Sequence, residues 1–305
     1  MAIQKELWLP VIEENFYSNW GILSQLAKDD SVYVMRNGSH VKVHIPNAGA
    51  GEDILKNNTS YPVSVVERTD VTVEYDVDSF QLPPVRVGHY DAAMLSYDKL
   101  SSVTKDLMGG IGEHIMLNSF VNWYIGKETG KFVETSDTGN TATSDAPAST
   151  TTVLGLGEAD VKKAAKILDL QKVPATGRIL LLAPQMFYQL HDSIIEKFDI
   201  VDNDGMLMLD KPFYGFSVRM THTVLNVQSN GTARPVGNAG ATSDLQVGFA
   251  YQKDQVSIAK EQTFVYSAED RPEYYGDIIS AESWAGGSYR RHDKKGIVPI
   301  LQKAE

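Results

Sequence analysis

The stretch Leu154-Gly-Leu-Gly-Glu-Ala-Asp160 has glycines at the spacing of a phosphate-binding turn, and it lies between a short apolar segment and a predicted helix. That placement is typical of a dinucleotide-binding turn, in which backbone N–H groups approach a pyrophosphate. However, Asp160 stands where a third glycine is expected, so its carboxylate would face the pyrophosphate. The next strand ends at Ala183-Pro184, without the acidic residue that would bind a ribose. We therefore interpret Glu158 and Asp160 as acidic residues that favour the start of a helix.

A second pattern, Asp199-Ile-Val-Asp-Asn-Asp-Gly205, resembles the start of a calcium-binding loop. Placing Gly205 at the sixth position of such a loop puts Ile200 at the first position and Lys211 at the twelfth, where carboxylate ligands are needed. Because both outer ligands are missing, the pattern favours a polar turn. Weak cation binding by Asp202 and Asp204 is the alternative.

The remaining reactive residue types are scattered. His191-Asp192-Ser193 contains the residue types of a catalytic triad, but neighbours on a helix point to different faces and cannot form a proton relay. The other histidines lack metal-ligand spacing such as HExxH; they are His40, His44, His89, His114, His222 and His292. A basic run at residues 290–295 would suit phosphate, although we favour a solvated tail. We therefore predict no catalytic, cofactor-binding or metal-binding residues and no enzyme activity.

The composition excludes several classes of protein. The chain has 305 residues, of which 42% are hydrophobic, which is enough for two units with their own cores. Its formal charge of -11, from 28 basic and 39 acidic residues, opposes broad electrostatic binding of nucleic acid or anionic lipid. With no cysteine the chain has neither disulfide nor thiolate chemistry, which fits a reducing compartment. Neither an export signal nor a membrane-spanning segment is visible.

The first part of the chain predicts an arm and a projecting loop. Residues 10–28 carry an amphipathic helical pattern, which either closes the core or lies against a neighbouring molecule. Alternating apolar residues at 41–45 and 71–77 predict two strands, with a hairpin turn at Asn37-Gly38. The polar segment between these strands is too long for a tight turn, so we expect the region to project from the body.

The longest helical pattern covers residues 97–125 and contains three glycines within one turn. Gly109, Gly110 and Gly112 each cost a helix interior about 1 kcal/mol relative to alanine. Either another backbone approaches the helix closely at this point, or the segment consists of two shorter helices joined by a hinge.

The second half of the chain alternates helix and strand patterns around one apolar strand. In order, it predicts a linker, a helix, a buried strand, a helix opened by proline, a surface loop, further strands, and a last strand with a turn at Gly286-Gly287. These segments cover residues 126–152, 160–170, 178–183, 184–195, 228–244, 245–266 and 276–287.

Taken in this order, the elements resemble the major capsid proteins of tailed bacteriophages with the HK97-type fold, over nearly the whole chain. The arm begins at Trp8-Leu-Pro10, and residues 97–125 resemble the long spine helix of that family. The other matching segments are the two strands of an extended loop, the entry to the spine helix, the axial strand with its helix, the following strand, and the returning strands: residues 38–46, 69–78, 84–87, 173–190, 214–218, 256–259 and 276–280.

The resemblance implies an α+β fold with five parts. These are an N-terminal arm, an extended β loop, a peripheral domain with the spine helix, an axial α/β domain, and a return to the peripheral domain with a C-terminal tail. We place them at residues 1–30, 31–85, 86–150, 151–260 and 261–305.

The resemblance also implies a structural function. Many copies would assemble as hexamers and pentamers into an icosahedral shell around double-stranded DNA, without sequence-specific DNA contacts, in the host cytoplasm and then in the virion. Because the arm begins at once, we expect a separate scaffolding protein, together with portal and decoration proteins. We expect no covalent cross-link, although Lys56 lies in the extended loop. Charge repulsion between subunits predicts that added salt strengthens assembly.

The sequence is compatible with two alternatives. Encapsulins, which are cellular shells that hold enzymes, share this fold, and the sequence alone does not separate them from phage capsids. A nucleotide-binding enzyme built on residues 150–225 is the alternative from another class.

Overall fold

The computed structural model describes residues 22–37, 40–47, 56–59, 61–63, 70–88, 99–128, 130–194, 198–203 and 206–305. The predicted start of the arm at Trp8, the turn residue Gly38 and the start of the spine helix at Tyr97 lie outside these residues. Residues 22–26 are helical, and both Leu23 and Leu26 are buried in the main core. This part of the arm therefore closes the core, as one of our two interpretations expected.

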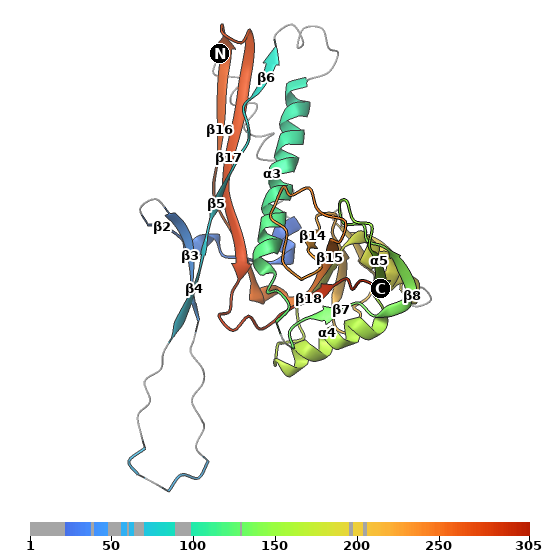
Figure 1. Ribbon diagram of the computed structural model, residues 1–305. Coiled ribbons are helices and arrows are strands. Elements are labelled where there is room, and N and C mark those ends of the chain that lie inside the picture. The colour runs from blue at the N-terminus through green and yellow to red at the C-terminus, as the bar shows by residue number, and fades with distance from the viewer. Residues whose placement is uncertain are drawn as a thin grey trace.

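A long helix and a long β hairpin run side by side and form the upright part of the molecule (Figure 1). The helix, α3, covers Lys99–Trp123, and the hairpin consists of β16 (Val256–Arg271) and β17 (Gly276–Tyr289). Three short strands complete a five-stranded sheet around this hairpin: β1 (Lys28–Asp29), β5 (Asp78–Gln81) and β6 (Val85–Gly88). The predicted spine helix is present, and it continues without a break through the three glycines, so the interpretation as two shorter helices with a hinge is wrong.

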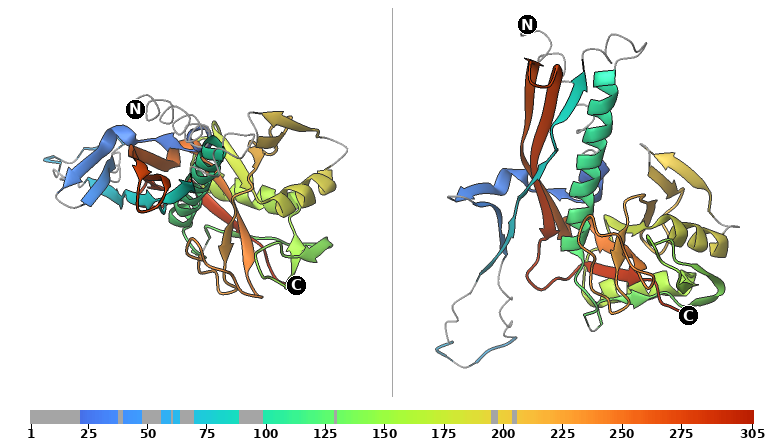
Figure 2. Two further views of the ribbon diagram at one scale, coloured as in Figure 1. Left: turned by 90° about the horizontal axis from the view of Figure 1, so that it is seen from above. Right: turned by 45° about the horizontal axis from the view of Figure 1, so that its top comes forward.

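The extended loop is built on a three-stranded antiparallel sheet that points away from the body (Figures 1 and 2). Its elements are the short helix η1 (Ser31–Tyr33) and strands β2 (Val34–Asn37), β3 (His40–Asn47) and β4 (Val71–Asp76). Val41, Val43 and Ile45 are buried on one face of β3, which confirms the predicted alternation. Only a small apolar cluster, which includes Tyr75 and Ala259, lies beneath these residues.

The axial region is an eight-stranded mixed sheet with helices α4 (Glu158–Leu170) and α5 (Pro184–Ile194) packed on one face. The strand order is β11-β12-β13-β10-β15-β18-β7, and β14 also pairs with β15. Their bounds are β7 Val133–Glu134, β10 Arg178–Leu182, β11 Ile200–Asn203, β12 Met206–Leu209, β13 Ser217–Met220, β14 Leu225–Val227, β15 Leu245–Gln252 and β18 Ile297–Leu301.

Alternate residues of the central strands face two different cores. Ile179 and Leu181 of β10 belong to the cluster beneath α3, whereas Leu180 and Leu182 belong to the cluster beneath α4 and α5. A strand buried on both faces requires a continuous apolar run, which explains the sequence of β10. The small helix η2 (Lys253–Gln255) connects β15 of the axial sheet to β16 of the long hairpin, so the two sheets are joined by continuous secondary structure.

Three predicted segments differ from the structure. The expected linker over residues 126–152 contains β7 and most of a hairpin made of β8 (Asp137–Thr143) and β9 (Thr152–Gly155). The expected turn at Gly286-Gly287 lies inside β17, which continues to Tyr289. The expected C-terminal tail includes β18, which is buried between β15 and β7. Strand β8 has few apolar residues, so its sequence shows no strand pattern. The five residues of β18 follow a charged run, which favoured a tail. The five domain boundaries stay predictions.

Candidate functional site

The glycine-rich turn before α4 is filled by the protein itself. A Cβ atom on Gly155 would lie 2.4 Å from the backbone oxygen of Asn140, so this glycine permits a close packing contact. Asp160 is fully buried, and its carboxylate accepts hydrogen bonds from the backbone nitrogen of Ser136 (2.9 Å) and from Lys163 Nζ (2.8 Å). The carboxylate thus occupies the helix N-terminus at which a phosphate would bind. Its place in the first turn of α4 matches the role we inferred for it.

The other motifs are likewise part of the scaffold. Asp202 lies in β11 opposite Leu207 of β12, whereas Asp204 and Gly205 lie outside the described residues. Ser193 Oγ donates a hydrogen bond to the backbone oxygen of Leu190 in its own helix, at 2.7 Å. Within the described part of the chain, no group of three or more His, Cys, Asp or Glu side chains is arranged to hold a metal ion.

The basic run at residues 290–295 is not a solvated tail, so that expectation is corrected. Its charged groups pair within the fold: Arg291 with Asp293 (2.8 Å), Lys294 with Glu128 (2.8 Å) and Lys295 with Asp293 (3.2 Å). The hydrogen bond from Lys294 also lowers the pKa of Glu128. This run therefore connects β17 to β18 as a turn stabilised by ion pairs.

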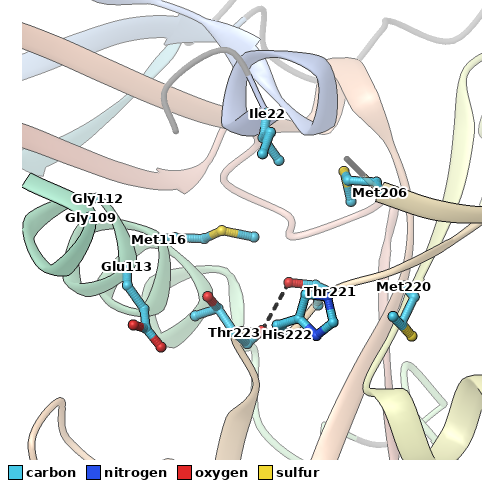
Figure 3. A pocket seen from close by; sticks show the side chains of 10 residues that line it. All are labelled: Ile22, Gly109, Gly112, Glu113, Met116, Met206, Met220, Thr221, His222 and Thr223. Carbon is cyan, nitrogen blue, oxygen red and sulfur yellow. Dashed lines mark hydrogen bonds between the residues drawn. The ribbon is translucent and has the colours of Figure 1, made fainter. Parts of the chain in front are cut away.

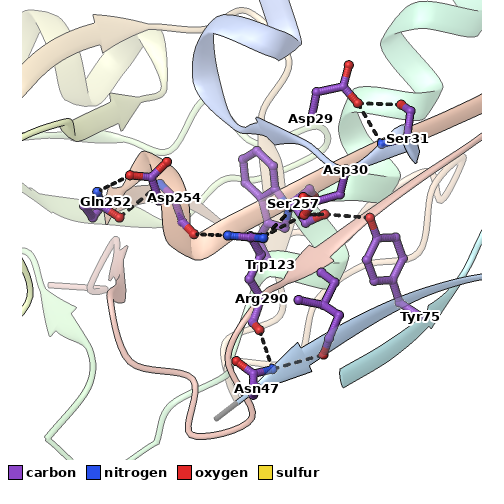
Figure 4. A network of polar contacts seen from close by, with 11 residues as sticks. Asp29, Asp30, Ser31, Asn47, Tyr75, Trp123, Gln252, Asp254, Ser257 and Arg290 are labelled. Carbon is purple, nitrogen blue, oxygen red and sulfur yellow. Dashed lines mark hydrogen bonds and ion pairs between the residues drawn. The ribbon is translucent and has the colours of Figure 1, made fainter. Parts of the chain in front are cut away.

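A buried polar network joins the base of the extended loop to the body, and we call it the junction (Figure 4). It contains Asp30, Asn47, Tyr75, Trp123, Ser257 and Arg290, which lie in or next to six different elements of the chain. Asp30 is fully buried and accepts hydrogen bonds from Arg290 Nε (2.8 Å) and Ser257 Oγ (2.7 Å). Because the single hydroxyl proton of Ser257 goes to Asp30, Tyr75 must donate the 2.7 Å bond between its hydroxyl and Ser257 Oγ.

The junction connects the loop strands to the spine helix through a few groups. Burial raises the pKa of Tyr75 still further above neutral pH, where its hydroxyl is protonated and acts as a donor. Trp123 Nε1 donates to the backbone oxygen of Ser257 at 3.2 Å, and Asn47 Nδ2 donates to the backbone oxygen of Arg290 at 2.9 Å. Hydrogen bonds of this kind fix how the bonded elements are oriented relative to one another, because each bond has a preferred direction. The junction therefore restricts the direction of the extended loop, together with the apolar contact of the loop sheet with Ala259.

Gly286 and Gly287 allow the same strand to be approached from both faces. A Cβ atom on Gly286 would lie 2.8 Å from the backbone oxygen of Asp76, at the end of β4. A Cβ atom on Gly287 would lie 2.8 Å from Ser119 Oγ of α3 and 2.9 Å from the backbone oxygen of Ser257. Sequence reasoning missed this site, although a glycine pair inside a strand pattern signals close backbone approach.

A pocket of about 370 Å³ lies between α3, the helical turn at residues 22–26 and the axial strands (Figure 3). Its lining residues are Ile22, Gly109, Gly112, Glu113, Met116, Met206, Met220, Thr221, His222 and Thr223. No described atom lies within 4 Å of a Cβ atom placed on Gly109 or Gly110. The close backbone approach that we considered is thus not made at these two glycines by the described residues of the same chain.

Large apolar side chains are exposed at the turn of the long β hairpin and at the base of the extended loop. Tyr275 is 80% exposed and Tyr274 is 49% exposed, both in the turn of the β16–β17 hairpin. Val32 is 91% exposed at the start of the extended loop. None of the described helices is long and apolar enough to cross a membrane. Exposed apolar side chains of this kind are typical of contact sites for other molecules.

Comparisons by sequence give no match: no family model fits the chain, and no curated protein resembles it. Comparison of structures finds similar proteins. The capsid of the cyanophage P-SCSP1u is similar over 91% of this chain and 86% of that chain, with a TM-score of 0.62 and 12% identity. The capsid of Ralstonia phage GP4 is similar over 92% and 87%, with a TM-score of 0.57 and 11% identity.

A cellular shell is also among the similar structures. The SrpI encapsulin of Synechococcus elongatus is similar over 92% of this chain and 86% of that chain, with a TM-score of 0.56 and 10% identity. The predicted HK97-type α+β fold is therefore confirmed, and phage capsids and an encapsulin share it.

Proposed function

We propose that this chain is the major capsid protein of a tailed bacteriophage, and that its copies assemble as hexamers and pentamers into an icosahedral shell around double-stranded DNA. The observation that carries the proposal is the likeness to the cyanophage capsid, which extends over 91% of the chain and 86% of its counterpart. The subunit would be made and assembled in the cytoplasm of a bacterial host and would reside in the virion.

The shape of the subunit supports this role. The extended loop and the β16–β17 hairpin both project from the axial region, so each subunit presents distant contact points to several neighbours (Figure 1). Such contacts can each be modest, because many of them act together in a closed shell. The junction restricts the angle of the loop, which lowers the entropy that association must otherwise cost.

The first test is negative-stain electron microscopy of the purified full chain, together with size-exclusion chromatography. We expect shells or capsomer rings, and light scattering that increases as salt is raised from low to physiological concentration, because subunits of charge -11 repel one another less. A small oligomer that never assembles, at any salt concentration and with a scaffolding protein co-expressed, would refute the proposal.

An encapsulin-like shell is the second candidate, which the SrpI encapsulin supports. Particles isolated from the native source distinguish the two by their contents. We expect nuclease-protected double-stranded DNA inside the particles, bound without sequence preference, and scaffolding, portal and decoration proteins as partners. An enzyme cargo without DNA would favour the encapsulin-like function.

A nucleotide-binding enzyme is disfavoured by the turn before α4, where Asp160 is fully buried and hydrogen-bonded. A thermal-shift assay with NAD and ATP tests this point. We expect no stabilisation by either nucleotide, and a saturable increase in Tm would revive the alternative.

A further inference from the structure

The two ends of the axial sheet differ in charge. At the β7 end, a groove of about 590 Å³ lies between β7 and α4, and three lysines line it: Lys163, Lys166 and Lys303. Glu134 also lines the groove, and its carboxylate is paired with Lys127 at 2.9 Å. Ile167 and Leu170 of α4 add apolar surface to the same groove, and the side chain of Leu170 is 73% exposed. A groove with this combination of ammonium groups and apolar surface suits a segment that carries both carboxylates and aliphatic side chains.

Two of these ammonium groups have no ion-pair partner among the residues that the structure describes. Lys163 pairs with the buried Asp160 at 2.8 Å. For Lys166 and Lys303, no carboxylate among the described residues lies within the 4.0 Å of an ion pair, and both lysines are exposed. In a chain with a net charge of -11, two neighbouring unpaired cations in a groove are a local reversal of the general surface charge.

The opposite end of the sheet carries the complementary features. Strand β11 lies at that edge, and β12 is its one strand partner in the described sheet. Asp199 precedes the strand and Asp202 lies within it, and both are exposed. Val201 between them is 45% exposed. A strand at the edge of the described sheet, with two exposed carboxylates and an exposed valine, fits a basic groove that also has apolar surface.

We propose that the β11 edge of one copy docks in the β7–α4 groove of the next copy, with Asp199 and Asp202 facing Lys166 and Lys303, and Val201 lying against Leu170. The inference rests on the proposed shell function and names one contact within its capsomers. Because the two surfaces differ and lie at opposite ends of one sheet, the contact is head-to-tail, and such contacts generate rings when the rotation closes.

Charge-reversal variants of the full chain test the contact. A groove variant carries Lys166→Glu with Lys303→Glu, and an edge variant carries Asp199→Lys with Asp202→Lys. Each variant alone places like charges opposite one another, and we expect the association constant for ring formation to fall by about tenfold or more. A chain that carries all four substitutions restores complementarity, and we expect it to form rings and shells again.

Mixing the two variants gives a sharper test. The groove variant has an acidic groove and an acidic edge, whereas the edge variant has a basic groove and a basic edge. Strict alternation satisfies every contact, and it closes in a ring of six but not in a ring of five. We therefore expect six-membered rings from the mixture and no five-membered rings.

A matched control variant carries the same change in net charge outside the groove. Lys28→Glu with Lys172→Glu changes the net charge equally at exposed lysines that do not line the groove, and we expect normal rings from it. Circular dichroism and Tm values close to those of the unmodified chain establish that each variant folds. Normal rings from the groove variant would overturn the inference while the shell function stands, as would normal rings with lost binding of DNA, which would assign the groove to a polyanion. Failure of the unmodified chain to assemble would instead refute the shell function.

Discussion

The axial sheet and the sheet of the extended loop are held in different ways. The axial sheet has apolar clusters on both faces, and all five residues of β10 and all five residues of β18 are buried. The loop sheet has three strands and one small cluster, and its base is fixed by the polar junction. The burial of apolar side chains stabilises the fold but does not favour one orientation of the packed elements. Hydrogen bonds favour one orientation and contribute a smaller net stabilisation. The axial region therefore determines whether the subunit folds, and the junction restricts where the loop points.

The largest expected effect lies in the axial core. Leu182→Ala removes a fully buried side chain from the cluster beneath α4 and α5, and we expect the free energy of unfolding to fall by about 4 kcal/mol. Ile45→Ala in the loop sheet is the matched change. We expect it to weaken hydrogen-exchange protection in β3 and β4 while the main denaturant transition stays in place. Equal losses in the main transition would show that the two sheets unfold as one unit.

The junction should be the next most sensitive place. Asp30→Ala leaves the guanidinium of Arg290, which is 18% exposed, without its carboxylate, and we expect a loss of about 3 kcal/mol in denaturant unfolding. Assembly yield should fall further than stability alone explains, because the loop loses its fixed direction. The neighbouring change Asp29→Ala removes an exposed carboxylate that bonds Ser31 and is the control, with an expected loss below about 1 kcal/mol. Similar results for both variants would contradict the role of the junction.

Gly286→Ala tests the contact between β17 and the loop base. The new methyl group would meet the backbone oxygen of Asp76 at 2.8 Å, and backbone cannot move aside as a flexible side chain can. We expect a loss of about 2 kcal/mol, measured by thermal unfolding, since overpacking typically costs this much. A stability equal to that of the unmodified chain would mean that the loop base shifts freely.

Gly109→Ala should have the smallest effect and the opposite sign. A methyl group there meets no described atom within 4 Å, so the substitution removes the helix cost of glycine and we expect the unassembled subunit to gain about 1 kcal/mol. Thermal unfolding of the unassembled chain measures this gain. If assembly fails although the subunit is more stable, a neighbouring subunit occupies the glycine face in the shell. A loss of subunit stability would show that the face is already filled within the chain.

The sequence predicted the fold where local patterns and topology agree. The continuous apolar run of β10 follows from burial on both faces of the strand. The alternation in β3 follows from burial on one face, and the periodicity of α3 follows from burial of one stripe. The contacts of the junction were not predictable in this way, because Asp30 and Arg290 are 260 residues apart and no local pattern links them. The glycines of β17 were misassigned to a turn for the same reason, since the atoms that require them belong to Asp76 and Ser119.

The pairing of β18 with β7 also has a consequence for timing. Val133 pairs with Ile300, so β7 cannot join the sheet during synthesis until nearly every other strand of the axial region has left the ribosome. Pairings of such long sequence separation form late in folding. A nascent chain accordingly lacks the completed β7 end of the sheet, and the groove between β7 and α4 is complete only after β18 has been synthesised.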